Sequence, residues 1–423
     1  MNLNALNRRV FLSGLAAAVA VPAVAAAQQT DSLPAAAGNA ALKGKLATKT
    51  EVVISRNEAA MVSRSSDEAM QAAIAMYDEI VAQGGWSQLA NTKYEKDTKS
   101  RNVLRLRERL VREGYLDLES LGGKAPDRFD EELAKALRAF QYNHGIYRSG
   151  KVDARTFKAL NIPAEQRLSM LIENATRVAA YADGLGPRNI LVNVPSVQLE
   201  TVEDGIVYAR HNVVVGKTER PTPTLVSTVT DVTFNPFWNA PASIVERDLI
   251  PKFLEDPGYL DQLRIRVFDG VGGPEVDPRL IDWFSTPADR FHFRQDPGKD
   301  NSLATVKVNF ANKHMVYMHD TPHRELFAIN ARYESSGCVR VDQVRTFIDW
   351  ILAGQEGFDD AQFEMITASE QTHVVPVQSG IDVRFMYLTA WATSDGRVSF
   401  RPDIYQLDGT GFVFGQPDPI TNM

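Results

Sequence analysis

The stretch Ser335-Ser336-Gly337-Cys338-Val339-Arg340 contains the one cysteine of this 423-residue chain. It follows His314-Met315-Val316-Tyr317-Met318-His319, whose composition predicts a strand with Tyr317 and His319 on one face and Met318 on the other. A helix is predicted from about Asp342, because apolar residues follow at helical spacing: Val344, Phe347, Ile348, Ile351 and Leu352. The sequence therefore predicts a strand, a glycine-containing turn that carries Cys338, and a helix that begins just beyond the turn.

This arrangement suits a nucleophilic cysteine. The thiolate is the reactive form, and a helix N-terminus, a neighbouring Arg340 and a histidine partner each favour the anion. Gly337 lets the backbone approach closely, so that the N–H groups of Gly337 and Cys338 can bind the oxyanion of a tetrahedral intermediate. A base at His319 would complete the pairing found in cysteine acyl transferases. The alternative is a small buried side chain without a catalytic role, which is the common state of a free cysteine.

The composition is that of a globular protein with more than one domain. The chain is 44% hydrophobic and 23% charged, which excludes wholesale disorder and a collagen-like chain. A single cysteine cannot form a disulfide within its own chain, so a disulfide scaffold is also excluded. The formal net charge of −7 does not have the sign expected of a nucleic-acid-binding protein, and no nucleic-acid partner is predicted.

The N-terminus resembles a targeting segment. Asn7-Arg8-Arg9-Val10-Phe11-Leu12 is followed by an alanine-rich run that ends at Ala25-Ala26-Ala27, as in a twin-arginine signal peptide with a small-residue cleavage site. The run is short, weakly apolar and interrupted by Pro22, so no stable membrane span is expected after cleavage. We therefore expect residues 1–27 to direct export to the periplasm, and residues 28–100 to form a linker and a helical scaffold segment.

Residues 101–165 are predicted to form a compact module of three short helices. The first has an apolar face of Val103, Leu106 and Leu110. Asp130 and Asp153 stand where N-caps of the second and third helices belong. The module ends with Gly150-Lys151-Val152-Asp153-Ala154-Arg155-Thr156-Phe157-Lys158-Ala159-Leu160 and resembles a peptidoglycan-binding domain, whose usual ending is Gly-x-x-Asp-x-x-Thr-x-x-Ala-Leu.

From residue 186 to 408 the pattern changes to runs of β-forming residues, which predict an antiparallel β domain. Residues 241–292 interrupt these runs with partly helical sequence rich in proline and glycine, and we expect them to form an inserted lid. Residues 409–423 are expected to be a C-terminal tail. The predicted fold class is α+β: a mainly antiparallel β catalytic domain with a helical insertion, preceded by the small three-helix module.

The histidine and cysteine segments together resemble the catalytic motif of the L,D-transpeptidase family. Met318-His319-Asp320-Thr321-Pro322 is followed by a loop and then by Ser335-Ser336-Gly337-Cys338-Val339-Arg340, which matches the family pattern Ser/Thr-x-Gly-Cys-x-Arg/Asn. Many members have a second histidine directly before the glycine, whereas this chain has Ser336. The longer periplasmic subtype, with a peptidoglycan-binding domain and an inserted capping subdomain, shares that departure and is the subtype that the whole chain resembles.

The resemblance implies a role for each motif residue. Cys338 would accept the acyl group, His319 would be the base, Gly337 and Cys338 would donate to the oxyanion, and Arg340 would help to order the site. The backbone carbonyl of Asp320 would orient the His319 ring. The resemblance also suggests substrate-lining residues, and the candidates are Tyr317, Trp238, Ser336 and Asp320.

The expected reaction is 3-3 cross-linking of peptidoglycan through a cysteine acyl-enzyme. The donor would be a tetrapeptide stem that loses its terminal D-Ala, and the acceptor would be the side-chain amine of diaminopimelate on another stem. Water or a lipoprotein lysine as acceptor would instead give an L,D-carboxypeptidase or a wall-anchoring enzyme. A different class, a non-catalytic peptidoglycan-binding protein, is opposed by the joint presence of His319, Cys338 and Arg340.

The expected partners are the stem peptides and glycan of peptidoglycan, and the resemblance implies carbapenem β-lactams as covalent inhibitors. No cofactor is expected. A metal site was considered because His314, His319, Asp320 and His323 are close in sequence. On a strand, His314 and His319 would face opposite sides, so no metal is predicted.

Overall fold

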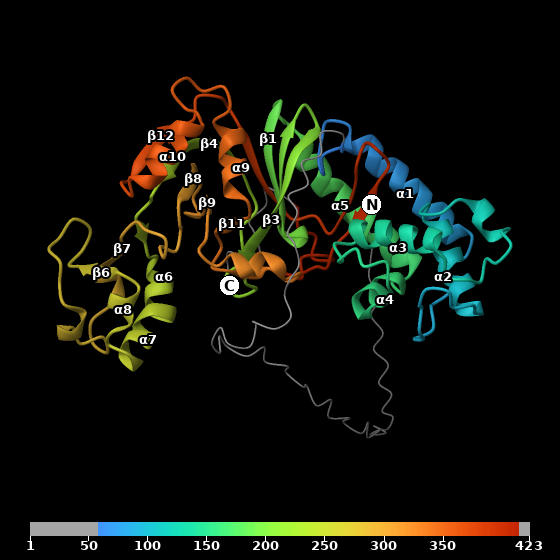
Figure 1. Ribbon diagram of the computed structural model, residues 1–423, viewed down its shortest axis with the longest axis horizontal. Helices are drawn as coiled ribbons and strands as arrows, with labels where there is room; N and C mark the ends of the chain where they lie inside the picture. Colours follow the sequence, from blue (N-terminus) through green and yellow to red (C-terminus); the bar gives the residue numbers. More distant parts are fainter. Residues whose placement is uncertain (1–57, 414–423) are drawn as a thin grey trace, which may run out of the picture. The chain divides into compact units, whose positions relative to one another are not determined.

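The computed structural model describes residues 58–413 (Figure 1). The expected signal peptide, residues 1–27, therefore lies outside the described residues, as do residues 414–423 of the expected tail. Within residues 58–413 no helix is both long enough and apolar enough to span a membrane.

The N-terminal part of the described chain is helical. Its elements are α1 (Ser66–Ala82), α2 (Arg101–Arg112), the 3-10 helix η1 (Leu118–Leu121), α3 (Glu131–Asn143), α4 (Ala154–Leu160) and α5 (Ala164–Ala182). The three predicted helices of the small module are confirmed as α2, α3 and α4. Asp130 accepts a hydrogen bond from the N–H of Leu133 at 2.9 Å, and Asp153 accepts one from Thr156 at 2.8 Å, so both predicted caps are present.

The helices of this module bury the apolar face that the sequence predicts. Val103, Leu106 and Leu110 are fully buried together with Leu137 and Phe140 of α3. Helix α1 ends before Gly84, which has a φ of 87° that other residues rarely adopt. The long helices α1 and α5 pack on one another and on β14 (Ala390–Ala392), which connects the helical region to the β-rich region.

The β-rich region is built on one sheet of ten strands. The strands are β1 (Arg188–Asn193), β2 (Gln198–Glu203), β3 (Ile206–Gly216), β4 (Leu225–Phe234), β8 (Val306–Phe310), β9 (Met318–His319), β10 (Tyr333–Ser335), β11 (Val339–Val341), β12 (His373–Pro376) and β13 (Asp382–Met386). Their order is β10-β3-β11-β9-β8-β4-β13-β1-β2, with β12 beside β4. Because β2 also pairs with β3, the sheet closes on itself.

Most neighbouring strands are antiparallel, as predicted, but three pairs are parallel: β1 with β13, β10 with β3, and β11 with β9. The predicted mainly antiparallel domain is confirmed, and the three parallel pairs are a feature that the sequence did not indicate. Parallel pairs join segments that are distant in sequence, and alternation within a strand carries no information about the direction of its partner.

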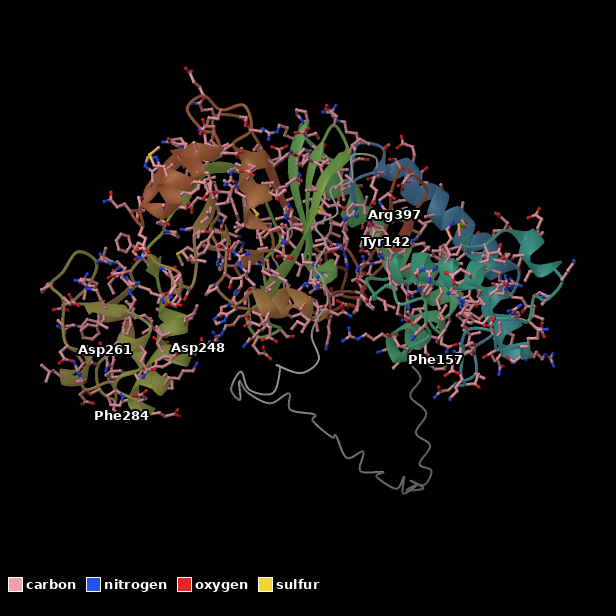
Figure 2. The ribbon with its side chains drawn as sticks, viewed as in Figure 1. Tyr142, Phe157, Asp248, Asp261, Phe284 and Arg397 are labelled. Carbon is pink, nitrogen blue, oxygen red and sulfur yellow. The ribbon has the colours of Figure 1, made fainter. Side chains whose placement is uncertain are left out.

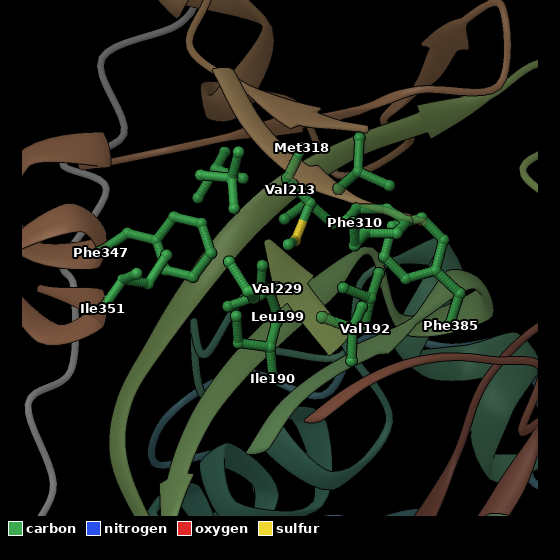
Figure 3. Packing of buried hydrophobic residues seen from close by; sticks show 14 of the residues in the cluster. Ile190, Val192, Leu199, Val213, Val229, Phe310, Met318, Phe347, Ile351 and Phe385 are labelled. Carbon is green, nitrogen blue, oxygen red and sulfur yellow. The ribbon is translucent and has the colours of Figure 1, made fainter. Parts of the chain in front are cut away.

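The interior of the sheet is filled by aliphatic and aromatic side chains (Figure 3). Ile190, Val192 and Leu199 come from β1 and β2, and Met318 comes from β9. Helix α9 (Val344–Ile351) contributes Phe347 and Ile351, so the apolar stripe predicted after Cys338 packs into this core. The remaining elements of the region are η2 (Val194–Ser196), η6 (Arg324–Ala328), α10 (Asp360–Ala368), β14, and β15 (Val398–Phe400).

The segment between β4 and β8 forms a lobe with its own core, here called the insertion lobe (residues 238–295). Its elements are β5 (Trp238–Asn239), α6 (Ala242–Ile244), the π-helical turn η3 (Val245–Leu249), α7 (Ile250–Glu255), α8 (Tyr259–Gln262), β6 (Ile265–Phe268), η4 (Pro278–Leu280), η5 (Ala288–Arg290) and β7 (His292–Gln295). The strands form a three-stranded sheet of order β5-β7-β6. Leu249, Phe253 and Phe293 are buried inside the lobe.

His211 of β3 makes the stability of this fold sensitive to acid. Its Nδ1–H donates to the carbonyl of Asp342 at 2.9 Å, the ring is fully buried, and burial lowers the pKa of His211 to about 4. The ring is neutral in the folded chain but is protonated in the unfolded chain below about pH 6.5, so stability falls as the pH drops from about 6.5 towards 4.

We expect this single group to remove about 2 kcal/mol of stability between pH 7 and pH 5. Urea unfolding gives the free energy of unfolding of the wild type and of His211→Gln at pH 7 and pH 5. At pH 7 the variant should be less stable than the wild type, and its free energy of unfolding should fall less between pH 7 and pH 5. Equal losses in the two proteins would contradict the assignment.

Candidate active site

Strands β9 and β11 bring the two predicted catalytic segments together. They run parallel, with Val339 opposite Met318 and Arg340 opposite His319, and the N–H of Val339 donates to the carbonyl of Tyr317 at 3.0 Å. Met318 and Val339 are fully buried in the core of the sheet. Because side chains alternate along a strand, the other face of this pair carries Tyr317, His319, Cys338 and Arg340.

The segment before His319 is less regular than predicted. Only Met318 and His319 are in a strand, and Met315 has a φ of 55° with its side chain exposed. The prediction of a strand from His314 was therefore wrong, although Tyr317 and His319 do lie on the same side. The left-handed conformation at Met315 interrupts the extended backbone two residues before Tyr317. The alternation of residue types in the sequence does not reveal this interruption.

Strand β11 also separates Cys338 from the helix that was predicted to follow it. Helix α9 begins at Val344, and its N-cap Gln343 has a left-handed conformation with φ 52°. The prediction that Cys338 lies at a helix N-terminus was therefore wrong. The electrostatic effect of a helix dipole is confined to the first turn, so the dipole of α9 does not stabilise the Cys338 thiolate.

The turn around Cys338 is fixed by hydrogen bonds. Gly337 has a φ of 111°, which strongly favours glycine. Its N–H donates to the hydroxyl of Ser335 at 3.2 Å, the same hydroxyl donates to the carbonyl of Cys338 at 2.6 Å, and Thr222 donates to the carbonyl of Gly337 at 2.8 Å. The Gly337 N–H, predicted as an oxyanion donor, is thus engaged within the turn. Sequence reasoning did not single out Ser335 or Thr222.

Cys338 is half-buried and lies beside Tyr317. The backbone N–H and the phenolic hydroxyl of Tyr317 both act to lower the pKa of the Cys338 thiol. Burial raises the pKa of the Cys338 thiol, and Tyr317, Lys307 and Arg340 oppose that rise. The thiol therefore depends on these neighbours to reach its anionic form.

His319 is held as a neutral base. It is buried, and its Nδ1–H donates to the backbone carbonyl of Asp320 at 2.5 Å, which leaves Nε2 free to accept a proton. Burial, reinforced by Arg340, lowers the pKa of His319 to about 3. Among the hydrogen bonds of residues 58–413 none joins His319 to Cys338, but the Tyr317 ring contacts His319 edge-on at 5.5 Å between ring centroids.

Asp320 does more than supply its carbonyl. Its carboxylate is fully buried and accepts from the Thr305 hydroxyl at 2.6 Å and from the N–H of Thr321 at 2.8 Å. Arg324 forms an ion pair with it at 3.1 Å. The carboxylate therefore fixes the loop that follows His319, a role that the sequence resemblance did not imply.

Two of the suggested substrate-lining residues are brought together. Trp238, in the first strand of the insertion lobe, opposes the rise in the pKa of Tyr317, so the lobe comes close to the residue that lies beside Cys338. Lys307, which sequence reasoning missed, lies opposite His319 in the β8–β9 register, and its ammonium is 4.2 Å from the centroid of the Tyr317 ring. Alternation along Val306–Phe310 places Lys307 away from the core, but only the strand register reveals its neighbours.

Lys307 is expected to lower the pKa of the Cys338 thiol. We predict that Lys307→Gln raises the pH midpoint of Cys338 alkylation by iodoacetamide by about 0.5 to 1 unit, because a nearby cation is lost, and that Lys307→Arg retains most of the effect. Lys313→Gln removes an exposed cation from the same region and serves as the matched control. An unchanged midpoint in Lys307→Gln would contradict this role.

Ser336 and Arg340 differ in their surroundings. Ser336 is exposed, and its hydroxyl accepts from the guanidinium of Arg220 at 3.0 Å. Arg220 also forms an ion pair with Asp248 in η3, so it joins the catalytic turn to the insertion lobe.

Arg340 is half-buried, and its Nε is buried without a hydrogen-bond partner among residues 58–413. Its charge acts on both Cys338 and His319.

No cluster of three or more histidine, cysteine, aspartate or glutamate side chains within residues 58–413 could hold a metal ion. The groups gathered around Cys338 are instead a thiol, a neutral imidazole, a phenol and two cations. This combination can activate a sulfur nucleophile and stabilise a developing negative charge.

Two protein-family models match parts of this chain. The family model described as "L,D-transpeptidase catalytic domain" matches residues 187–365, which include both His319 and Cys338. Residues 187–365 of the chain thus match an L,D-transpeptidase catalytic domain. The model described as "Putative peptidoglycan binding domain" matches residues 99–160, the α2–α4 module. The L,D-transpeptidase resemblance and the predicted α+β class are thereby confirmed.

Known proteins with the L,D-transpeptidase domain are similar over part of the chain. A Haemophilus influenzae protein named "Putative L,D-transpeptidase" is 35% identical over 254 residues, which are 60% of this chain and 50% of the relative. The match thus spans about half the length of that curated relative.

Solved structures are more distant. An L,D-transpeptidase from Xylanimonas cellulosilytica is 17% identical and covers 71% of this chain and 100% of its own, with a TM-score of 0.23. L,D-transpeptidase 3 from Mycobacterium tuberculosis, solved with a faropenem-derived adduct, is 12% identical and covers 47% of this chain and 60% of its own, also with a TM-score of 0.23.

Proposed function

We propose that this protein is an exported peptidoglycan L,D-transpeptidase that forms 3-3 cross-links through an acyl-enzyme on Cys338. The observation that carries the proposal is the β9–β11 pairing, which places Cys338, Tyr317 and His319 on one face of two neighbouring strands. The family model over residues 187–365 supports the reaction class, and the module at residues 99–160 supports a cell-wall substrate.

In the proposed first step, His319 Nε2 takes the proton of the Cys338 thiol and the sulfur attacks the carbonyl carbon between diaminopimelate and the terminal D-Ala. The C–N bond breaks, the proton passes to the leaving D-Ala amine, and a thioester remains. In the second step the acceptor amine attacks the thioester, its proton passes through His319 to the departing sulfur, and an amide forms. Contacts of the base with the nucleophile in such enzymes commonly tighten only when substrate is bound.

The neighbours of Cys338 have complementary parts in this scheme. Tyr317, Lys307 and Arg340 each favour the thiolate. The N–H of Cys338 would bind the oxyanion, and Gly337 could add its own N–H only after releasing Ser335. Trp238 and Ser336 would contact the donor stem from the insertion lobe and the catalytic turn. By the same reasoning, a carbapenem is proposed to acylate Cys338.

Incubation of the mature protein with purified disaccharide-tetrapeptide tests the proposal. Intact-mass spectrometry should detect an acyl adduct, peptide mapping should place it on Cys338, and free D-Ala should appear with cross-linked dimer. Tripeptide in place of dimer would favour the carboxypeptidase alternative. Absence of both adduct and D-Ala, with binding to sacculi retained, would support the non-catalytic class.

The insertion lobe is proposed to keep water from the thioester. Arg220 binds Asp248 of the lobe and Ser336 of the catalytic turn, so loss of this link should let the lobe open. We predict that Asp248→Asn raises the ratio of tripeptide to dimer by about three- to ten-fold. Glu275→Gln breaks an exposed ion pair with Arg266 inside the lobe and should leave the ratio unchanged. Equal ratios in all three proteins would exclude this role of Arg220.

A further inference from the structure

A second candidate binding site lies away from Cys338, where the peptidoglycan-binding module meets the L,D-transpeptidase domain. A cavity of about 790 Å³ is lined on one side by residues 144–146, which follow α3, and by α4 and α5, and on the other side by segments around residues 195–197, 330–333 and 400–408. This volume is in the range of pockets that hold small-molecule ligands. None of the residues predicted to be catalytic lines it.

Excess positive charge distinguishes the walls of this cavity. Arg155 and Lys158, on α4, are exposed and form no ion pair with any residue among 58–413. Arg167 and Arg401 are 2% and 7% exposed and have no ion pair within the same residues. Burial, together with neighbouring guanidinium groups, lowers the pKa of Arg401 to about 9. Cations in such surroundings are stabilised by an anionic ligand.

The carboxylates that line the cavity do not neutralise these cations. Glu173 and Asp408 are each paired with Arg177 at 2.7 Å. Asp403 accepts hydrogen bonds from the Tyr387 hydroxyl at 2.5 Å and from the N–H of Leu407 at 3.0 Å. None of these carboxylates forms an ion pair with Arg155, Lys158, Arg167 or Arg401 within residues 58–413, so the four cations of the cavity wall have no carboxylate partner there.

Three lining residues also keep buried polar atoms that have no hydrogen-bond partner among residues 58–413. These atoms are Nε of Arg167, Nε of Arg401 and Nε2 of His144. His144 donates from Nδ1 to the carbonyl of Phe140 at 2.8 Å, and burial keeps its pKa well below the usual value, so the unpartnered Nε2 is an acceptor. The hydrogen-bonding capacity of these two donors and one acceptor is unused within residues 58–413, and unsatisfied groups of this kind are uncommon in native interiors.

We propose that this cavity binds a peptidoglycan stem peptide, with its carboxylates at the cationic wall and an N–H or O–H group at His144. This assignment rests on the function proposed above. A stem peptide combines several carboxylates with amide N–H groups and short apolar side chains, and the cavity also has apolar lining at Ile162, Met170 and Ile404. The site would hold a peptidoglycan chain of the cell wall between the two domains.

The cavity is connected to the catalytic turn by a short path. Tyr333 lines the cavity and begins β10, which ends at Ser335. Ser335 in turn holds both Gly337 and Cys338 through its hydroxyl. A ligand in the cavity is therefore bound within a few residues of the segment that positions the nucleophile.

The test uses the full mature chain with Cys338 alkylated by N-ethylmaleimide, which prevents turnover, and disaccharide-tripeptide as the probe. Calorimetric titration should show binding that is at least about ten-fold weaker in the double variant Arg155→Gln/Lys158→Gln, because two charge-assisted contacts are lost. Ala331→Trp, at an exposed rim position, should weaken it similarly by filling the cavity. A probe with amidated carboxylates should also bind more weakly.

The matched control is Lys124→Gln/Lys135→Gln, which removes two exposed cations from the same module outside the cavity. Its Kd should equal that of the unsubstituted chain. Equal affinity in the cavity variants, or no binding of the probe at all, would overturn the proposal. D-Ala release by the unalkylated protein is measured in parallel. If D-Ala is released but the cavity variants bind the probe as tightly as the unsubstituted chain, only the cavity site is overturned. If the cavity variants bind the probe more weakly but no D-Ala is released, the cavity site is supported and the catalytic proposal is rejected.

Discussion

Replacing Cys338 by alanine is expected to abolish D-Ala release from disaccharide-tetrapeptide, with a loss of at least about 10⁴-fold. The sulfur is the one nucleophile on the face shared by Tyr317 and His319, and no other cysteine exists in the chain to replace it. Release is measured by a coupled assay for free D-Ala, with adduct formation followed by mass spectrometry.

Two further variants separate loss of the nucleophile from loss of structure. Cys338→Ser keeps the size of the side chain but supplies a poorer nucleophile, so it should also fail to form an adduct while unfolding at nearly the wild-type temperature. His319→Gln should retain alkylation of Cys338 by iodoacetamide but lose most D-Ala release. Substantial D-Ala release by Cys338→Ala would show that the reaction does not proceed through this sulfur.

Replacing Arg210 by methionine is expected to destabilise the fold by about 3–5 kcal/mol, because it leaves a buried carboxylate without its cation. Glu200 is fully buried and accepts from Arg210 at 2.8 and 2.5 Å. Arg210 also binds Glu58 at 2.7 Å. Urea unfolding at pH 7 gives the free energy of unfolding of each variant.

The double variant Glu200→Gln/Arg210→Met distinguishes the cost of an unpaired charge from the loss of packing. It removes both charges and should recover a large part of the stability lost in Arg210→Met. Arg128→Met breaks the exposed pair with Asp97 and should remain close to wild type. A double variant no more stable than Arg210→Met would show that the unpaired carboxylate is not the cause.

The helical elements were predictable because their signals are local. Asp130 and Asp153 cap the helices as their positions in the sequence indicate, and Val103, Leu106 and Leu110 form the buried face. The signals in these helices repeat within a few residues, so no knowledge of distant segments is needed. The same holds for the apolar stripe of α9.

The catalytic face could be predicted only in part. Residue types and motif order indicated Cys338 and His319, but the contacts around them depend on which strands pair and in which register. Lys307 reaches Tyr317 through the β8–β9 pairing, and Trp238 reaches it from another sheet. Such pairings are set by packing across the whole domain rather than by neighbouring residues.

The N-terminal end of the described chain is part of the β-rich region. Val207 donates to the carbonyl of Glu58 at 3.0 Å, and Ala60 donates to that of Gly205 at 3.0 Å. The Glu58 carboxylate accepts from Arg210, from Tyr142 of α3 at 2.9 Å and from Arg397 at 2.9 Å. Figure 2 labels Tyr142 and Arg397, which lie close to one another. One side chain thus joins the N-terminal end of the described residues, the small helical module and the segment around Arg397.

This junction has a consequence for the order in which the protein folds. Glu58 and Arg397 are 339 residues apart in sequence, so their contact forms only after almost the entire chain has been synthesised. Contacts of such long range slow folding, because the entropy of closing the intervening chain is lost before the contact contributes. The small helical module depends mainly on local contacts, so we expect it to form before its attachment to the catalytic region.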